Sequence, residues 1–274
     1  MPNLARIWRK SKAIVRKGPS TLRNIVYARL GYWPVSRIDG CDIQPIPTYC
    51  VSLTRAQSRR RLMAKQAETM GLSRFRILDA VDSRNLDYER LKQDGLYDET
   101  VCRKYHPNGL SLNEIACSLS HATVYDLIVE NGDPVALIVE DDALFVTRRV
   151  SRFRLADIPA DFDVVFLNAF LDREPPRGHI QGMIYDDSSF AGSAAAYIVS
   201  AQGARKLRNV SRPVIHAADG LLGRSMCTLP GEENHPFRQR GAATTITGYI
   251  LYPELVINGS IGHYHLSEVM NASD

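Results

Sequence analysis

Several common functional signatures are missing from this chain of 274 residues. No apolar run approaches the roughly 18 residues that a membrane-spanning helix needs. The N-terminus lacks an apolar segment followed by small residues, so we expect no secretory signal. No GxGxxG or GxxxxGK[ST] pattern occurs, which argues against the usual dinucleotide and P-loop sites. No serine stands in a GxSxG elbow, so serine hydrolysis has no support.

Cysteine is sparse and irregularly spaced. The five cysteines form no CxxC pair and are odd in number: Cys41, Cys50, Cys102, Cys117 and Cys227. This pattern argues against a disulfide framework or a structural zinc site, and it favours a reducing compartment. Cys50 and Cys117 lie within apolar patterns, so we predict that both are small core residues.

Acidic residues are absent from residues 1–37, which carry nine of the 34 Lys and Arg. The rest of the chain carries the other 25 basic residues and all 30 acidic residues, so its net charge is −5. Trp8 and aliphatic residues at helical spacing predict a basic amphipathic helix suited to an anionic membrane surface. A solvated tail and an organellar transit peptide are the alternatives. We expect no nucleic-acid partner, because no aromatic–basic array follows.

The chain beyond the basic segment begins with a β-α-β pattern. Residues 49–53 form an apolar strand, residues 57–70 show helical spacing, and residues 75–78 form a second strand. Such alternation is typical of an α/β fold with a mainly parallel, Rossmann-like sheet flanked by helices. We predict a single domain over residues 46–274, preceded by a basic helical extension over residues 1–45.

The same alternation continues along the chain. A capping box at Ser111 and Glu114 predicts the start of a helix that Gly132 ends, and a buried strand over residues 135–139 follows. Further strands are predicted at 163–167 and 193–200, with a helix at 201–209 and an extended segment at 249–257. Residues 171–189 are rich in charge, proline and glycine, and are long enough to be a mobile lid.

Three adjacent carboxylates, Glu140, Asp141 and Asp142, follow the buried strand. They repel one another and are costly to desolvate, so they favour a compensating cation. Alternate residues of an extended segment face the same way, so we predict that Glu140 and Asp142 point together and Asp141 elsewhere. Ligands of open α/β sheets bind beyond the carboxyl ends of strands. The alternative is a solvated turn in which Asp142 caps a helix.

Other candidates for chemistry lie elsewhere in the chain. His263 and His265 would face one side of an extended segment and would favour manganese or zinc at an acidic site, unless they are an incidental surface pair. Asp219 is a candidate general base at a pocket wall, or else a helix N-cap. The guanidinium group of Arg55 or Arg59 is placed to donate two parallel hydrogen bonds to a diphosphate. The other arginines between residues 55 and 61 are predicted to lie on a solvated helix face.

Four segments of the chain read VSLTRAQSRRR, LDAVDSRNL, ACSLSHATVYDLIVENGDPVALIVEDDALF and GSAAAYIVSAQGARKL. Together they resemble glycosyltransferase family 25, which includes lipopolysaccharide and lipooligosaccharide sugar transferases and collagen galactosyltransferases. The family's Cys-x-Leu-Ser-His signature stands at residues 117–121 and its acidic signature at residues 140–142. The resemblance covers about residues 47–222. It implies a GT-A architecture, a nucleotide-sugar donor, commonly UDP-galactose, and inversion at the anomeric carbon, usually with Mn²⁺ or another divalent cation.

The residue patterns and the resemblance, taken together, give a working hypothesis for the site. The chain would transfer galactose or a related hexose from a UDP-sugar to a lipid-linked oligosaccharide, at the cytoplasmic face of the bacterial inner membrane. Metal would be held by Glu140, Asp142, His263 and His265, and the reaction would depend on Asp142 and the base Asp219. The donor pocket would be formed by Leu53, Thr54, Arg55, Arg59, Asp79, Asp82, Ser120, His121, Glu140, Asp141 and Ser193.

Alternatives remain open at this point. In the first alternative, His121 is a buried histidine whose ring nitrogens are hydrogen-bonded within the fold, rather than a residue of the donor pocket. A metal-dependent phosphohydrolase would need more carboxylates and histidines arranged for two metals, and one acidic cluster is evident. A non-catalytic nucleotide-sugar-binding protein of the same fold would be expected to carry a broken acidic motif, and the motif is intact.

Overall fold

The structure is a computed structural model that describes residues 38, 40–168, 176–186, 193–226 and 246–259. The predicted basic helix over residues 1–37 and the histidines His263 and His265 lie outside the described residues. None of the helices that the structure describes is both long and apolar enough to cross a membrane.

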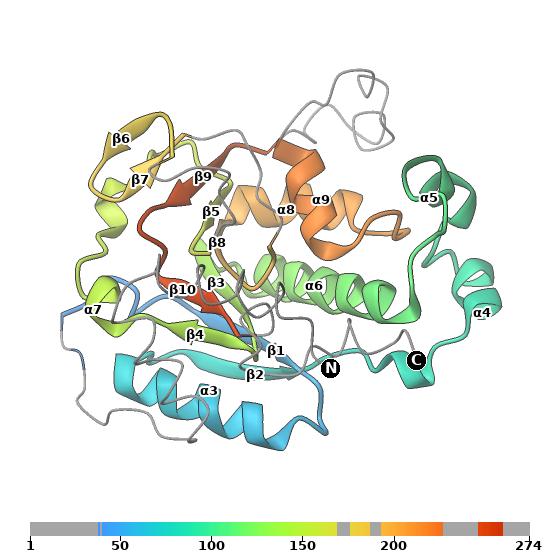
Figure 1. The fold of residues 1–274 in the computed structure, drawn as a ribbon, viewed down its shortest axis with the longest axis horizontal. Helices are drawn as coiled ribbons and strands as arrows, with labels where there is room; N and C mark the ends of the chain where they lie inside the picture. The colour runs from blue at the N-terminus through green and yellow to red at the C-terminus, as the bar shows by residue number, and fades with distance from the viewer. Residues whose placement is uncertain (1–37, 39, 169–175, 187–192, 227–245, 260–274) are drawn as a thin grey trace, which may run out of the picture.

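A central sheet of eight strands has the order β2-β1-β3-β8-β5-β9-β7-β6 (Figure 1). Its strands are β1 (Thr48–Ser52), β2 (Phe75–Asp79), β3 (Val135–Glu140), β5 (Val164–Phe166), β6 (His179–Gln181), β7 (Ile184–Tyr185), β8 (Ala196–Ser200) and β9 (Gly248–Leu251). The pairs β1–β2, β1–β3 and β5–β9 are parallel, whereas β8 is antiparallel to β3 and β5, and β7 to β9 and β6. Six strands therefore run in one direction, which confirms the predicted α/β fold with a mainly parallel sheet.

Helices pack on both sides of this sheet. They are α3 (Gln57–Met70), α4 (Tyr88–Gln93), α5 (Glu99–Tyr105), α6 (Leu112–Asn131), α7 (Thr147–Val150), α8 (Ala201–Val210) and α9 (Ala218–Met226). Short 3₁₀ turns lie at Ser83–Asn85 and Leu155–Asp157, and a two-stranded antiparallel sheet joins β4 (Ala143–Phe145) to β10 (Val256–Asn258). Figure 1 shows α3 on one side of the sheet and α6, α8 and α9 on the other.

Strand β3 lies at the centre of the fold. Ala136 and Ile138 belong to the hydrophobic cluster that contains residues of α6, α8 and α9, whereas Leu137 and Val139 belong to the cluster that contains residues of α3. All four side chains are fully buried. A strand covered on both faces must be apolar at consecutive positions, which is the pattern seen in the sequence. The prediction of a strand buried on both faces is confirmed.

The helix that precedes β3 begins and ends where its caps predict. Ser111 Oγ accepts a hydrogen bond from the backbone N–H of Glu114, and the Glu114 side chain accepts one from the backbone N–H of Ser111. At the other end Gly132 has φ 66°, a left-handed conformation that residues with a Cβ rarely adopt. These caps hold α6 in register against the sheet.

Two predictions made from local pattern need correction. Residues 176–186, within the predicted mobile lid, form the β6–β7 hairpin that extends the sheet beside β9. The predicted extended segment over residues 249–257 is split between β9 in the large sheet and β10 in the small one. Upstream of the expected domain start, Cys41 and Ile43 are buried in the same cluster as Ile46.

Candidate active site

A pocket opens beyond the carboxyl ends of the parallel strands β2, β1 and β3, where α/β sheets bind ligands. The space between its lining side chains, counted together with the open mouth, is about 670 Å³. The lining includes seven predicted site residues, namely Leu53, Arg55, Arg59, Ser120, Glu140, Asp141 and Asp142. It also includes eight that were not predicted, namely Val51, Ser52, Ala80, Val81, Ser83, Asn113, Ala116 and Cys117.

The carboxylates of residues 140–142, the acidic tip of β3, are held by their neighbours, and Asp141 contacts β1 and α3. Ser52 donates a hydrogen bond of 2.5 Å to its Oδ2, and a guanidinium nitrogen of Arg59 lies 3.1 Å from its Oδ1. Asp141 thus ties the ends of β1 and β3 together and places the Arg59 cation at the pocket. Asp142 is 5% exposed and lines the same pocket.

Glu140 reaches back toward helix α6. Its Oε1 lies 3.3 Å from Nε2 of His121 and accepts a hydrogen bond of 3.5 Å from the Cys117 thiol. Burial by itself would raise the pKa of the Glu140 carboxyl, but the hydrogen bonds with His121 and Cys117 and the charge of Arg59 outweigh it, so the pKa is lowered. Glu140 is therefore ionised at neutral pH and faces the pocket with 27% of its side chain exposed.

Helix α6 supports the acidic tip through buried polar residues. His121 is 1% exposed, and its Nδ1 lies 2.8 Å from the hydroxyl of Tyr197, which lies 2.8 Å from that of Tyr125. Ser120 accepts a hydrogen bond from the backbone N–H of Val81 and so connects α6 to the segment after β2. His121 is thus a buried, satisfied histidine that also contacts a pocket carboxylate.

The arginine run after β1 is held by acidic residues from the end of β2. Arg55 pairs with Asp82, whose pKa lies below the usual carboxyl range because of its hydrogen bonds to Arg84 and Arg55. Arg60 donates to the backbone carbonyl of Ser52 and to the carboxylate of Asp79. The prediction of a solvated helix face is therefore wrong for Arg60, because its side chain folds back onto the end of β1.

Several predicted residues are not part of the pocket lining. They are Thr54, Asp79, Asp82, His121, Ser193 and Asp219. Ser193 is buried, and its Oγ accepts a hydrogen bond from Ala195 N–H. Asp219 lies in the first turn of α9, half-buried, and accepts a hydrogen bond from Gly220 N–H. Burial raises the pKa of the Asp219 carboxyl, and the negative charge of Glu140 adds to the rise.

Four polar residues of the pocket lining were not predicted from the sequence, namely Ser52, Ser83, Asn113 and Cys117. Ser52 was treated as part of an apolar strand, and Cys117 as a small core residue. Cys50 is fully buried as predicted, but Cys117 is half-buried, lines the pocket and contacts Glu140. The spacing of Cys117 and His121, four residues apart on one helix, was the signal that they share a face.

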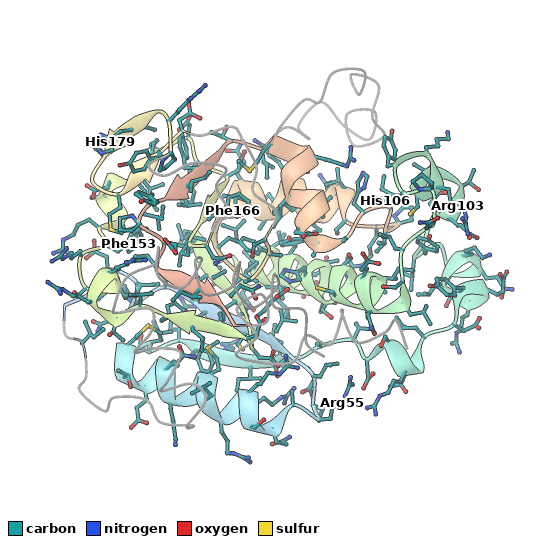
Figure 2. All side chains as sticks on the ribbon, in the orientation of Figure 1. Arg55, Arg103, His106, Phe153, Phe166 and His179 are labelled. Carbon is teal, nitrogen blue, oxygen red and sulfur yellow. The ribbon has the colours of Figure 1, made fainter. Side chains whose placement is uncertain are left out.

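The acidic tip has donor chemistry that fits a divalent cation. Carboxylate oxygens of Glu140 and Asp142 border one pocket, and hard oxygen donors suit Mn²⁺ and Mg²⁺. The cationic side chains of Arg55 and Arg59 border it too. Figure 2 labels Arg55 near the start of α3, on the opposite side of the molecule from His179 in β6. The pocket therefore combines acidic side chains from the end of β3 with two cationic side chains that follow β1.

Comparisons with known proteins identify the family. A model described as "Glycosyltransferase family 25 (LPS biosynthesis protein)" matches residues 45–222. "Procollagen galactosyltransferase 1-B" of Xenopus laevis is 26% identical over 176 residues, which are 59% of this chain and 28% of that protein. "Putative glycosyltransferase" of Haemophilus influenzae is 23% identical over 218 residues, which are 78% of this chain and 74% of that protein. "Probable inactive glycosyltransferase 25 family member 3" of Bos taurus is 25% identical over 170 residues, 58% of this chain and 28% of that protein.

These similarities have a defined extent. The chain spans less than a third of the procollagen galactosyltransferase's length and about three quarters of the Haemophilus protein. The family match covers well over half of this chain, and it includes every residue that lines the pocket. The match over residues 45–222 shows that this chain belongs to glycosyltransferase family 25.

Proposed function

We propose that this chain transfers a hexose, with galactose as the first candidate, from a UDP-sugar to a glycan acceptor, with inversion at the anomeric carbon. The observation that carries the proposal is the acidic tip of β3, which opens into a pocket beside Arg55 and Arg59 inside the family match. Galactose is favoured because one similar protein is named a procollagen galactosyltransferase. A lipid-linked oligosaccharide is the proposed acceptor.

The residues of the pocket have separate tasks in this proposal. Glu140 and Asp142 would hold a Mn²⁺ ion, which when bound would neutralise the donor diphosphate and stabilise the departing nucleotide. Arg55 and Arg59 would direct guanidinium donors at the phosphate oxygens. Asp141 keeps Arg59 in place through its ion pair of 3.1 Å, and guanidinium has further donors for a phosphate.

Inversion in one step needs a base on the face of the sugar opposite the leaving group. As the acceptor oxygen bonds to the anomeric carbon, the bond from that carbon to the diphosphate breaks, and the acceptor's proton passes to the base. We assign this role to Asp219. Its half-buried position and raised pKa are the environment in which a carboxylate is a better proton acceptor.

Two rival functions receive less support. A two-metal phosphohydrolase would place several carboxylates and histidines around two ions. Within the part of the chain that the structure describes, one group of three such side chains lies together, namely Cys117, His121 and Glu140. The second rival, a non-catalytic binding protein, has a precedent in the similar protein named as inactive, but here the acidic tip is complete and the pocket is lined by it.

Donor binding tests the proposal directly. We expect isothermal titration with a panel of UDP-hexoses to show that UDP-galactose binds when Mn²⁺ is present and weakens strongly when the metal is chelated. The Asp142→Asn variant should lose the metal-dependent part of the binding, whereas Asp94→Asn at the exposed end of α4 should keep it. Equal binding of UDP-galactose with and without metal would contradict the proposed donor site.

We also propose that the basic segment attaches the enzyme to the cytoplasmic face of a membrane that carries its acceptor. The support is nine basic residues without an acid in residues 1–37, together with Trp8 and aliphatic residues at helical spacing. The full chain should float with anionic vesicles, and a chain lacking residues 1–37 should stay in the dense fraction. Uncharged vesicles are the control, because they remove the electrostatic attraction. Unchanged flotation after the deletion would refute this attachment.

A further inference from the structure

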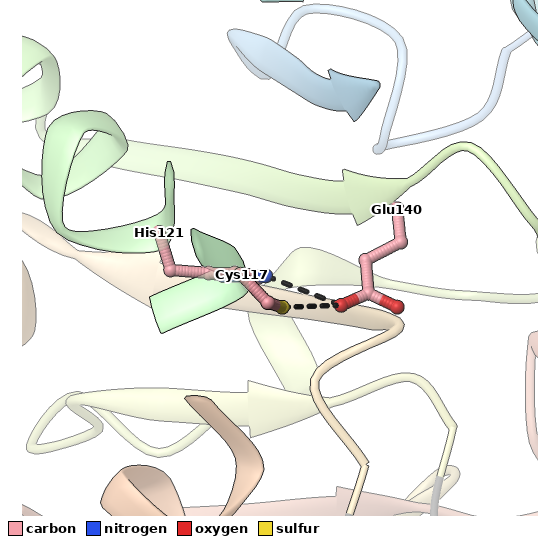
Figure 3. A group of neighbouring side chains, drawn as sticks. All are labelled: Cys117, His121 and Glu140. Atoms are coloured by element: carbon pink, nitrogen blue, oxygen red, sulfur yellow. Dashed lines mark hydrogen bonds and ion pairs between the residues drawn. The ribbon is translucent and has the colours of Figure 1, made fainter. Parts of the chain in front are cut away.

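The side chains of Cys117, His121 and Glu140 converge at the edge of the pocket (Figure 3). Cys117 and His121 are four residues apart on α6, so they project from the same face of the helix. Glu140 reaches them from the end of β3. One ligand atom from each, Sγ, a ring nitrogen and a carboxylate oxygen, lies within 4.8 Å of the other two.

Two of the three separations within this group match edges of a zinc tetrahedron. Tetrahedral zinc with Zn–S of about 2.3 Å and Zn–N and Zn–O of about 2.1 Å places its sulfur and oxygen ligands about 3.6 Å apart, and its nitrogen and oxygen ligands about 3.4 Å apart. The corresponding distances in this chain are 3.5 Å from Cys117 Sγ to Glu140 Oε1 and 3.3 Å from His121 Nε2 to the same oxygen. The third separation, from the Cys117 sulfur to the His121 ring nitrogen, is within 4.8 Å and would have to close to about 3.6 Å where it is longer.

The surroundings of His121 favour a metal ligand. In the metal-free chain Nε2 lies 3.3 Å from Glu140 Oε1 and can donate to that carboxylate. With a metal at Nε2 the proton would be on Nδ1, which lies 2.8 Å from the Tyr197 hydroxyl and can donate to it. Tyr197 can in turn donate to Tyr125, 2.8 Å away. Metal-bound histidines commonly donate their other N–H to a buried acceptor in this way, which sets the ring orientation.

We propose that Cys117, His121 and Glu140 bind one Zn²⁺ ion, with the fourth coordination position open to the pocket. Three protein ligands from sulfur, nitrogen and oxygen plus one open position are typical of zinc sites that bind an exogenous ligand. Both Cys117 and Glu140 line the pocket, so an ion can enter from it. On binding, the Cys117 thiol loses its proton to the solvent and the sulfur bonds to the metal.

The site has a consequence for sugar transfer, and this part of the inference depends on the proposed function. Glu140 would serve both the zinc site and the proposed Mn²⁺ site with Asp142. A zinc ion at Cys117 and His121 would draw Glu140 toward α6 and so away from the donor diphosphate. Zinc is therefore expected to inhibit Mn²⁺-dependent transfer, and chelation should restore it.

Metal binding itself can be measured without any assay of transfer. The full chain is titrated with Co²⁺ and then with Zn²⁺, and absorbance is recorded. We expect one equivalent of Co²⁺ to produce a thiolate-to-cobalt charge-transfer band together with the visible bands of a tetrahedral ion, and Zn²⁺ to abolish both. Substitution of a residue that only supports a metal ligand weakens metal binding by about 10–100-fold. Loss of a ligand itself in Cys117→Ser should therefore weaken Co²⁺ binding at least about 100-fold and remove the charge-transfer band.

Matched variants identify which atoms bind. Glu140→Gln should weaken Co²⁺ binding but keep the charge-transfer band at high metal concentration, because the thiolate remains. Cys102→Ser, at a buried cysteine in α5, and His179→Asn, at an exposed histidine in β6, should change neither. Absence of the band in the parent chain, or its survival in Cys117→Ser, would overturn the inference. If transfer proceeds but no band forms, the zinc site is wrong and the proposed function stands.

Discussion

Replacing Asp142 by asparagine should lower kcat for transfer from a UDP-sugar by at least about 100-fold, the effect of removing one strong electrostatic contact from a transition state. Asp142 lines the pocket beside Glu140 and is 5% exposed, so little water can take over its charge. Asparagine has nearly the same shape but no charge, and it is a weaker ligand for a hard cation. The loss should therefore appear in metal-dependent steps.

The measurement is UDP release and product formation over a range of Mn²⁺ concentrations. For Asp142→Asn, we expect the concentration of Mn²⁺ needed for half-maximal rate to rise along with the fall in kcat. Asp94→Asn is the control, because Asp94 is exposed and its carboxylate lies 3.5 Å from Arg90 in a surface ion pair, a contact worth less than about 1 kcal/mol. Full metal-dependent activity in Asp142→Asn would show that the acidic tip is not the metal site.

The second large effect is expected at Asp219. Asp219→Asn should lower kcat by about 100- to 10,000-fold, the usual contribution of a general base. Binding of the UDP-sugar should change little, because Asp219 is not among the residues that line the donor pocket. Loss of donor binding in this variant would instead assign Asp219 to the structure of the donor site.

The pH dependence gives an independent readout of the same carboxylate. A base must be ionised, so kcat/KM in the parent chain should fall as the pH drops through the pKa of Asp219. Burial and the charge of Glu140 raise that pKa, so the fall should begin above the usual carboxyl range. Asp219→Asn should remove this limb of the profile from its residual activity.

The Asp219→Asn substitution should lower activity without lowering the stability of the fold. A carboxyl whose pKa is higher in the folded chain than in the unfolded chain destabilises the fold at pH values above both pKa values, because ionisation costs more in the folded state. At neutral pH the Tm of Asp219→Asn should therefore equal or exceed that of the parent. A clearly lower Tm would mean that the Asp219 charge stabilises the fold at neutral pH, because asparagine keeps an oxygen that can accept from Gly220 N–H.

Much of the fold follows from patterns within about twenty residues of sequence. The consecutive apolar residues of β3 predicted a strand covered on both faces, and Ser111, Glu114 and Gly132 predicted the ends of α6. Such signals are local, because hydrogen-bonded caps and hydrophobic periodicity act along one element. The hairpin within the predicted lid was not foreseen, for the opposite reason. It is stabilised by β9, which comes more than sixty residues later.

The candidate site also combines a feature that the sequence predicts with contacts that only the tertiary structure creates. By itself the sequence determined that three carboxylates follow a buried strand, because no other stretch combines such an apolar run with such a charged end. Only the tertiary structure decided their partners. The parallel pairing of β1 with β3 brings Ser52 and Arg59 to Asp141, and the packing of α6 brings Cys117 and His121 to Glu140. These contacts join residues 19 to 89 positions apart, and strand order rather than local propensity determines which of them meet.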